Sequence, residues 1–364
     1  MALTLTFLGK GGTGRTTLAI AAAQQLAASS KRVLLVGQDG SPAWKLLLET
    51  EVGCDPTPIT NNLKAVQLKS ALLLEHSWEE IKKLENQYVR TPFFKSVYGQ
   101  ELGILPGMDS ALALNAIRQY DASGDYDVII YDGLASQETL RMLGMPEILS
   151  WYIRRFRNIF MESDLGKALS PFVQPIATSV LSIDISGDTF AKPTQDMNNI
   201  LEQGRVAVSD PNRVAAYLVT NEDEVAIATA RYLWGSAQQV GLTIGGVLLN
   251  QALLTEPIAE AFVPLAVSVI PQRSGQNWQP LLDSLPDFTQ AQLAPKPIDI
   301  DVAQRKVSLF LPSFDKKQVK LTQYGPEVTI EAGDQRRNIF LPPALTGKPV
   351  TGAKFQNGYL TISF

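Results

Sequence analysis

The chain has 364 residues, 45% of them hydrophobic, and a formal net charge of −4. This length fits about two domains with sizeable cores, and the acidic balance argues against a nucleic-acid partner, which needs a basic surface. Cys54 and His76 are the only residues of their types, which excludes an internal disulfide and a Cys/His zinc site within one chain. No charged segment followed by an apolar core opens the sequence, so no signal peptide is expected. No apolar run reaches the ~18 residues of a membrane span, so no stable membrane insertion is expected.

The first predicted strand leads into a glycine-rich loop. Residues 3–8 alternate in polarity, Gly9–Thr17 reads GKGGTGRTT, and residues 18–28 have strong helix propensity. A strand, a glycine loop and a helix N-terminus in this order form a phosphate cradle, because backbone N–H groups and the helix dipole face the anion. The spacing is that of the P-loop, with Arg15 in place of the lysine and the hydroxyl of Thr16 placed to ligate Mg²⁺. The alternative is a tight turn without a ligand, and Lys10 within the loop weighs against it.

Apolar runs and helical patterns then alternate to about residue 285. Short runs predict buried parallel strands at residues 33–36, 128–131, 215–220, 244–249 and 266–270. The clearest helical patterns cover residues 110–120, 138–149 and 224–240. This alternation predicts an α/β fold with a doubly wound parallel sheet that binds ligands at the carboxyl ends of its strands. Residues 151–199 break the alternation and predict a helical insertion.

The pattern changes where Pro286, Pro295 and Pro297 interrupt the chain. We predict a linker at residues 286–303 between a first domain, residues 1–285, and a second domain, residues 304–364. Alternating segments in the second domain predict strands at residues 307–311, 319–324, 328–331, 338–341, 351–355 and 359–364. The expected architecture there is a small all-β sandwich.

The glycine loop resembles the deviant P-loop of the arsenite-pump ATPase family, whose eukaryotic branch delivers tail-anchored membrane proteins in the guided-entry pathway. Further landmarks of that family follow in order, namely QDGSPA at residues 38–43, PGMDSAL at 106–112, YDVIIYD at 126–132, TLRMLGMPE at 139–147 and LNQ at 249–251. Together they cover about residues 1–285. From Val307 the sequence resembles the α-crystallin domain of small heat-shock proteins, with LPSFDK at 311–316, RRN at 336–338 and NGYLTI at 357–362. This combination is typical of a branch of the family found in photosynthetic lineages.

The resemblance implies ATP and Mg²⁺ as cofactors and gives roles to the matching residues. The phosphates would be bound by Gly11, Gly12, Thr13, Gly14, Arg15, Thr16 and Thr17. Thr16 would ligate Mg²⁺, Asp132 would hold the ion through water, and Asn250 would contact the adenine. Asp39 would activate the attacking water, and Lys10 would reach the nucleotide of the partner subunit in a homodimer. The alternatives are helix caps for Asp39 and Asp132, a turn role for Asn250, and a solvated loop charge for Lys10.

Three departures from the family pattern bear on activity. Arg15 is longer and planar, so it can clamp phosphate oxygens without reproducing the geometry of a lysine. Residues 132–138 read DGLASQE where the second switch of the family reads DTAPTGH. The zinc-binding Cys-x-x-Cys of the eukaryotic branch and the arsenite-binding cysteines are absent, so we expect no zinc in the dimer.

The sequence therefore predicts a dimeric ATPase, slow or fast, that serves as a chaperone or targeting factor in the cytoplasm or the equivalent plastid stroma. Its partners would be the transmembrane segments of tail-anchored clients, bound by the helical region 151–199, for which an ordinary structural cap is the alternative. A second hypothesis is a nucleotide-binding regulator with little or no hydrolysis because of Arg15. A third, a positioning ATPase similar to ParA or MinD, expects a basic DNA face or an amphipathic C-terminal helix, and the sequence ends in predicted strands instead.

Overall fold

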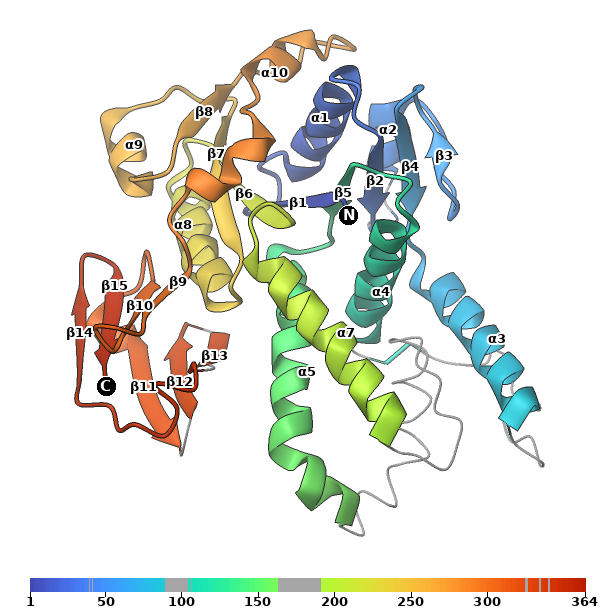
Figure 1. Ribbon diagram of the computed structural model, residues 1–364. Helices are drawn as coiled ribbons and strands as arrows, with labels where there is room; N and C mark the ends of the chain where they lie inside the picture. Colours follow the sequence, from blue (N-terminus) through green and yellow to red (C-terminus); the bar gives the residue numbers. More distant parts are fainter. Residues whose placement is uncertain are drawn as a thin grey trace.

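The computed structural model describes residues 1–38, 40, 42–88, 104–105, 107–162, 191–324, 327–333, 335–339 and 341–364. An eight-stranded sheet with helices on both faces forms the larger part, and two smaller sheets form the rest (Figure 1). The predicted fold class, a doubly wound α/β domain followed by a small β domain, is confirmed.

The large sheet has the strand order β3-β4-β2-β5-β1-β6-β7-β8. Its strands are β1 (Leu3–Leu8), β2 (Val33–Gly37), β3 (Thr57–Pro58), β4 (Leu63–Gln67), β5 (Val128–Asp132), β6 (Val214–Thr220), β7 (Thr243–Asn250) and β8 (Val267–Ile270). Every neighbouring pair is parallel except β3 and β4. Strands β2, β5 and β6 are buried along their whole length, which explains their uninterrupted apolar sequences. The sequence analysis missed β4, because the exposed Lys64 interrupts the apolar run by which the other buried strands were recognised.

Helices cover both faces of this sheet. Their bounds are α1 (Arg15–Ala28), α2 (Ala43–Leu48), α3 (Ser70–Tyr88), α4 (Met108–Ser123), α5 (Ser136–Glu162), α7 (Ala191–Ser209), α8 (Glu224–Gln239), α9 (Glu256–Phe262) and α10 (Gln279–Ser284). One core cluster joins α1, α2 and α10 to one face, and a second joins α4, α5, α7, α8 and α9 to the other. Among the described helices, none is both long enough and apolar enough to cross a bilayer.

The predicted helix over 138–149 continues into the predicted helical region that begins at residue 151, and the two form a single helix there. Helix α5 runs without a break from Ser136 to Glu162 and includes Pro146. Helix α7 lies beside it, and Gly204 of α7 leaves room for the proline ring, because a Cβ atom there would lie 3.0 Å from Pro146 Cγ. Residues 163–190 of the predicted region lie outside the described residues.

The C-terminal part consists of two antiparallel sheets, β14-β15-β10-β9 and β11-β12-β13. Its strands are β9 (Ile298–Asp301), β10 (Lys306–Phe310), β11 (Val319–Tyr324), β12 (Glu327–Ala332), β13 (Gln335–Ile339), β14 (Gly352–Gln356) and β15 (Tyr359–Ser363). Side chains from both sheets, such as Leu309, Ile330 and Ile362, form a shared core. We call this part, residues 298–364, the sandwich.

The segment predicted as a linker, residues 286–303, is packed and partly regular. It contains the 3-10 helix η3 (Phe288–Leu293) and strand β9, which pairs with β10. Phe288 is buried, and its ring meets those of Phe7 and Tyr217 edge-on at centroid distances of 5.9 and 4.8 Å. The prolines therefore lie where the α/β domain gives way to the sandwich, and the aromatic contacts of Phe288 pack the segment against the large sheet.

Candidate functional site: the phosphate loop

The glycine loop joins β1 to α1, and geometry requires three of its glycines. Gly12 and Gly14 have φ angles of 85° and 99°, which side chains disfavour. A Cβ atom on Gly9 would collide with the carbonyl oxygen of Val219. Gly14 is the N-cap of α1, and no side chain of the described residues caps the helix there. The first N–H groups of α1 and the exposed Gly11 and Gly12 therefore suit an anion.

Lys10 reaches the N-terminus of α8 in its own chain. Its Nζ atom lies 3.0 Å from Oδ2 of Asp223, and both side chains are 44% exposed. Asp223 is also the N-cap of α8, where it accepts a hydrogen bond from the N–H of Ala226. The hydrogen bond from Lys10 holds the pKa of Asp223 below its ordinary value. Because the pair is exposed, it can be exchanged for another partner at little cost.

Arg15, the first residue of α1, contacts the segment between β5 and α5. Its Nη2 atom donates to the carbonyl oxygen of Leu134 at 3.2 Å, and Nη1 lies 3.5 Å from the hydroxyl of Ser136. Ser136 is buried at the start of α5, and its hydroxyl bonds both the N–H and the C=O of Gly9 at 2.9 Å. The forked guanidinium therefore ties the phosphate loop to the segment that was predicted to be the second switch. A lysine has a single ammonium group and does not reproduce this pair of contacts.

Asp132 ends β5 and is 4% exposed. Its Oδ2 atom accepts a hydrogen bond from the indole Nε1 of Trp44 on α2 at 3.1 Å. The indole lies against the backbone of Gly37, where a Cβ atom would collide with it. The carboxylate predicted to hold Mg²⁺ through water is thus oriented by the helix that follows residues 39–41. Asp39 itself lies outside the described residues, so its catalytic role stays a prediction.

Asn250 ends β7 and braces the phosphate loop. It is 6% exposed, and its Nδ2 atom donates to the carbonyl oxygen of Thr13 at 2.9 Å. A Cβ atom on Gly14 would collide with the same amide, so the close approach depends on glycine. Thr13 continues the network by donating its hydroxyl to the carbonyl oxygen of Lys10 at 2.8 Å. The predicted contact of Asn250 with adenine stays a prediction.

The structure thus gathers most of the predicted residues at the carboxyl edge of the sheet. Thr16 and Thr17 are half-buried in the first turn of α1. Sequence reasoning missed Trp44, Ser136 and Asp223 as members of the site. Ser136 and Asp223 carried a signal, since each is a capping-type residue directly before or at the start of a helix, whereas nothing local connects Trp44 with Asp132.

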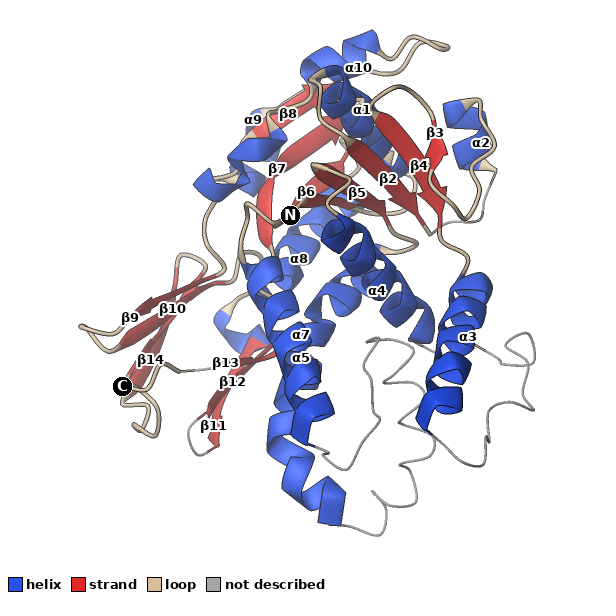
Figure 2. Ribbon diagram, turned by 45° about the vertical axis from the view of Figure 1, so that its right-hand side comes forward, coloured by secondary structure: helices blue, strands red, loops and turns tan. Residues whose placement is uncertain are grey.

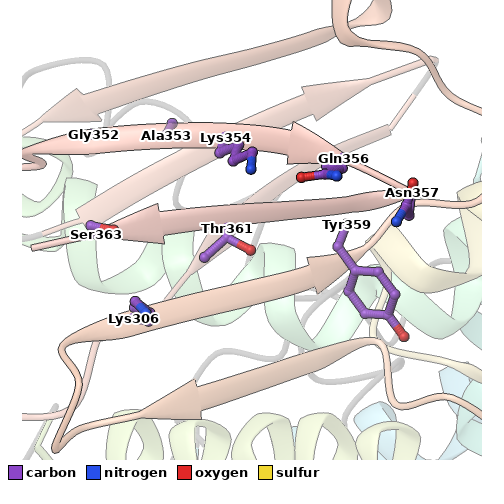
Figure 3. A pocket seen from close by; sticks show the side chains of 9 residues that line it. All are labelled: Lys306, Gly352, Ala353, Lys354, Gln356, Asn357, Tyr359, Thr361 and Ser363. Carbon is purple, nitrogen blue, oxygen red and sulfur yellow. The ribbon is translucent and has the colours of Figure 1, made fainter.

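A hollow elsewhere on the molecule shares no residue with the phosphate loop. It lies over the outer face of the sheet that contains β10, β14 and β15, and has a volume of about 780 Å³. Figure 3 shows polar side chains around it, including Lys306, Lys354 and Thr361, with Tyr359 at one end. It is wide open to solvent, as expected of the polar outer face of a sandwich sheet.

Comparison with known proteins agrees with both resemblances seen in the motifs. Residues 3–267 match the family described as "Anion-transporting ATPase", and residues 303–364 match an "HSP20-like domain found in ArsA". A protein of Prosthecochloris vibrioformis named as an arsenical pump-driving ATPase is 26% identical over 388 residues, covering 99% of this chain and 95% of the relative. A protein of Chlorobaculum tepidum with the same name gives the same values. "ATPase GET3" of Malassezia globosa is 24% identical over 253 residues, covering 68% of this chain and 72% of the relative.

Proposed function

This chain belongs to the anion-transporting ATPase family, and from that premise we propose that it is an ATP-binding dimeric chaperone or targeting factor for apolar segments of membrane proteins. The observation that carries the proposal is the N-terminus of α1, which no described side chain caps, behind the Gly9–Gly14 loop. Such an end accepts phosphate through backbone N–H groups. Relatives named as ATPases support ATP as the ligand and Mg²⁺ as its ion.

Within this proposal, the residues around the loop bind and orient MgATP. The bound ion neutralises charge on the phosphates. The hydroxyl of Thr16, in the first turn of α1, would hold it directly, and Asp132 would hold it through water. Trp44 orients the Asp132 carboxylate through the indole hydrogen bond. Asp39 would position the attacking water, so that hydrolysis depends on placement more than on covalent chemistry.

Arg15 sets the rate of hydrolysis in this proposal. Its guanidinium already contacts Leu134 and Ser136, and this favours the second candidate function, a nucleotide-binding regulator with little hydrolysis. Calorimetry with millimolar MgATP tests binding, and absence of binding contradicts both functions. Arg15→Lys should raise the hydrolysis rate, while Asp39→Asn should abolish it and retain binding. Normal hydrolysis by the Asp39→Asn variant would remove Asp39 from the catalytic set.

A homodimer would complete the site across its interface. Lys10 stands at the exposed carboxyl edge of the sheet, where a second subunit could bring phosphates to it. Exposed apolar side chains accompany it on three nearby segments, Leu134 before α5, Val225 on α8 and Leu253 after β7. Light scattering with and without MgATP tests the dimer. A monomer under both conditions would exclude Lys10 from catalysis.

Helices α5 and α7 are the proposed client-binding elements. They lie side by side on the side of the molecule away from α1 and α10 (Figure 2). Ile148 and Tyr152 on α5 and Val206 on α7 are apolar and exposed. A transmembrane helix of ~20 residues would be a fitting guest. Co-expression with a tail-anchored protein should lose client recovery on Ile148→Asp, whereas Leu293→Asp, at an exposed position on η3, should retain it. Equal recovery would mean that the helices are a structural cap.

A further inference from the structure

Two helices run from the phosphate loop to the sandwich. Helix α8 starts at Asp223, which bonds Lys10. Helix α5 starts at Ser136, which bonds Gly9 and lies next to Arg15. Helix α8 is continuous, and α5 continues through Pro146, one residue before Glu147, so each helix joins the loop to its own contact with the sandwich.

The far parts of these helices meet at one residue of the sandwich, Arg337 on β13. Its Nη1 atom donates to the carbonyl oxygen of Gln238 in the last turn of α8 at 3.0 Å. Its Nε atom lies 3.7 Å from Oε1 of Glu147 on α5. The arginine is 7% exposed, and burial lowers its pKa. A second contact joins α5 to the sandwich, since Trp151 donates its indole N–H to Oε2 of Glu327 at 2.7 Å.

Aromatic packing supplies the apolar part of this interface. The Phe314 ring lies directly over Gly235 of α8, where a Cβ atom would collide with it. Tyr232 and Trp234, also on α8, meet Phe314 and Phe310 with ring centroids 5.9 and 5.4 Å apart. Figure 1 shows the sandwich placed beside α8 and the middle of α5.

The polar part of the interface is incompletely paired. Within the described part of the chain, Ser236 Oγ, both amide atoms of Gln238 and of Gln239, and Arg337 Nε are buried without a hydrogen-bond partner. A polar group buried without a hydrogen bond loses its hydration without compensation, although Arg337 Nε keeps its ion pair with Glu147 at 3.7 Å. These buried polar groups oppose docking, whereas the aromatic contacts and the bonds of Arg337 and Trp151 favour it.

We propose that the sandwich is a reversible latch whose docking on α5 and α8 is coupled to occupancy of the phosphate loop. Phosphates in the loop attract Arg15, and those of a partner subunit attract Lys10, so the nucleotide competes with Ser136 and Asp223 for these side chains. Rearrangement of the loop around phosphate then moves the start of α8, which Lys10 has released, and the start of α5, which stays tied to Gly9 through Ser136. This shift separates Gln238 and Glu147 from their common partner Arg337. The inference rests on the proposed ATP binding. It requires reciprocity, since a ligand that opens the latch binds more tightly when the latch is already open.

Hydrogen exchange and calorimetry on the full chain test the coupling. MgATP, or a non-hydrolysable analogue with Mg²⁺, should speed amide exchange in residues 232–239 and 335–339. Arg337→Met keeps an unbranched chain but removes the charge, and should speed exchange there without nucleotide. The same variant should bind the analogue about fivefold or more tightly. Arg336→Met is the matched control, since Arg336 is exposed and, among the described residues, its ion pair is with Glu331 on the neighbouring strand, and it should behave as the parent.

Trp151→Phe is a second variant that should open the latch. It removes the hydrogen bond to Glu327 while keeping an aromatic ring in α5, and it should speed exchange and raise nucleotide affinity as Arg337→Met does. Unchanged affinity in Arg337→Met and Trp151→Phe chains whose exchange shows an open latch would overturn the coupling. So would a parent chain that binds the analogue with no change in exchange. If neither the parent chain nor any variant binds nucleotide, both the proposed function and the coupling are contradicted. If the chains bind nucleotide but docking and affinity do not change together, only the latch is contradicted.

Discussion

The phosphate loop and the interface with the sandwich differ in how far their polar side chains are hydrogen-bonded. At the loop, Lys10, Arg15 and Asp132 each have a hydrogen-bond partner within the chain. At the interface, both amide atoms of Gln238 and of Gln239 are buried without a hydrogen bond to any described residue. The loop is thus a satisfied resting arrangement that a ligand must displace, and the interface depends on aromatic packing. Different substitutions therefore act first on each region, and the proposed latch is what couples ligand binding to docking.

The largest expected effect comes from crowding the interface. In Gly235→Ala, the new methyl group would collide with the Phe314 ring and lie 2.5 Å from the carbonyl oxygen of Pro312. Overpacking costs about 1–3 kcal/mol, and the upper end applies because a backbone oxygen cannot rotate away. The higher helix propensity of alanine offsets about 1 kcal/mol of that cost. We expect the free energy of unfolding, measured in urea, to fall by about 2 kcal/mol on balance.

Gly204→Ala in α7 is the control for this variant. Its Cβ atom approaches only the Pro146 side chain, at 3.0 Å from Cγ, and helix propensity should offset that contact. If Gly235→Ala is as stable as the parent, the interface is soft enough to move aside, and aromatic packing does not define it.

The next effect tests the satisfied character of the loop. Trp44→Phe keeps an aromatic ring against Gly37 but removes the donor to Asp132. Weakening the hydrogen bonding of a buried carboxylate should lower the free energy of unfolding by about 1 kcal/mol, measured in guanidinium chloride by far-UV circular dichroism. Trp278→Phe is the control, because the Trp278 ring is stacked under Arg273 at 4.5 Å and is only partly buried. Equal losses in both variants would mean that the indole bond does not matter.

A smaller effect is expected from Arg15→Lys. The two contacts of the guanidinium, at 3.2 and 3.5 Å, are long and half-exposed. Their loss should cost about 0.5 kcal/mol, or about 1–2 °C in the melting temperature of a domain of this size. Thermal unfolding without nucleotide measures it. A drop of ~8 °C would show that Arg15 is chiefly a structural residue, and would weaken its assignment to phosphate.

The smallest effect concerns Asp223 and depends on pH. Its pKa is depressed by Lys10, so the pair stabilises the fold above the unfolded pKa of the carboxyl group and loses that contribution as pH falls through the folded pKa. Asp223→Asn retains a helix cap and should be slightly less stable than the parent at pH 7. The two melting temperatures should converge in acid. A difference that persists after the carboxyl is protonated would point to capping, and Glu222→Gln serves as the neighbouring control.

The sequence allowed prediction of the fold wherever the signal was local. The continuous apolar runs of β2, β5 and β6 and the glycine loop needed only neighbouring residues to be recognised. Helix α5 was divided at residue 151 because the alternation of strands and helices stopped there, although Pro146 and Gly204 fit together and the helix continues. The segment 286–303 was predicted to be a linker because of its prolines. The contact of Phe288 with Phe7, which packs this segment on the sheet, joins residues far apart in the chain and leaves no local signal.

The same distinction holds for the candidate site. Loop residues such as Gly12 and Gly14 were predictable because their backbone conformation is a property of glycine itself. The bond between Trp44 and Asp132 spans 88 positions, and that between Gln238 and Arg337 spans 99. Pairs of this kind follow from the way helices pack on a completed sheet, so no short pattern contains them.

Strand β1 sits in the middle of the large sheet, between β5 and β6. It precedes both neighbours in the chain, so neither pairing can form until residues 128–132 and then 214–220 have been synthesised. Pairings this distant in sequence form slowly and leave apolar strands unprotected meanwhile. The loop that β1 positions therefore takes shape only after most of the larger domain has been translated, and the sandwich, which packs on α8, is translated later still.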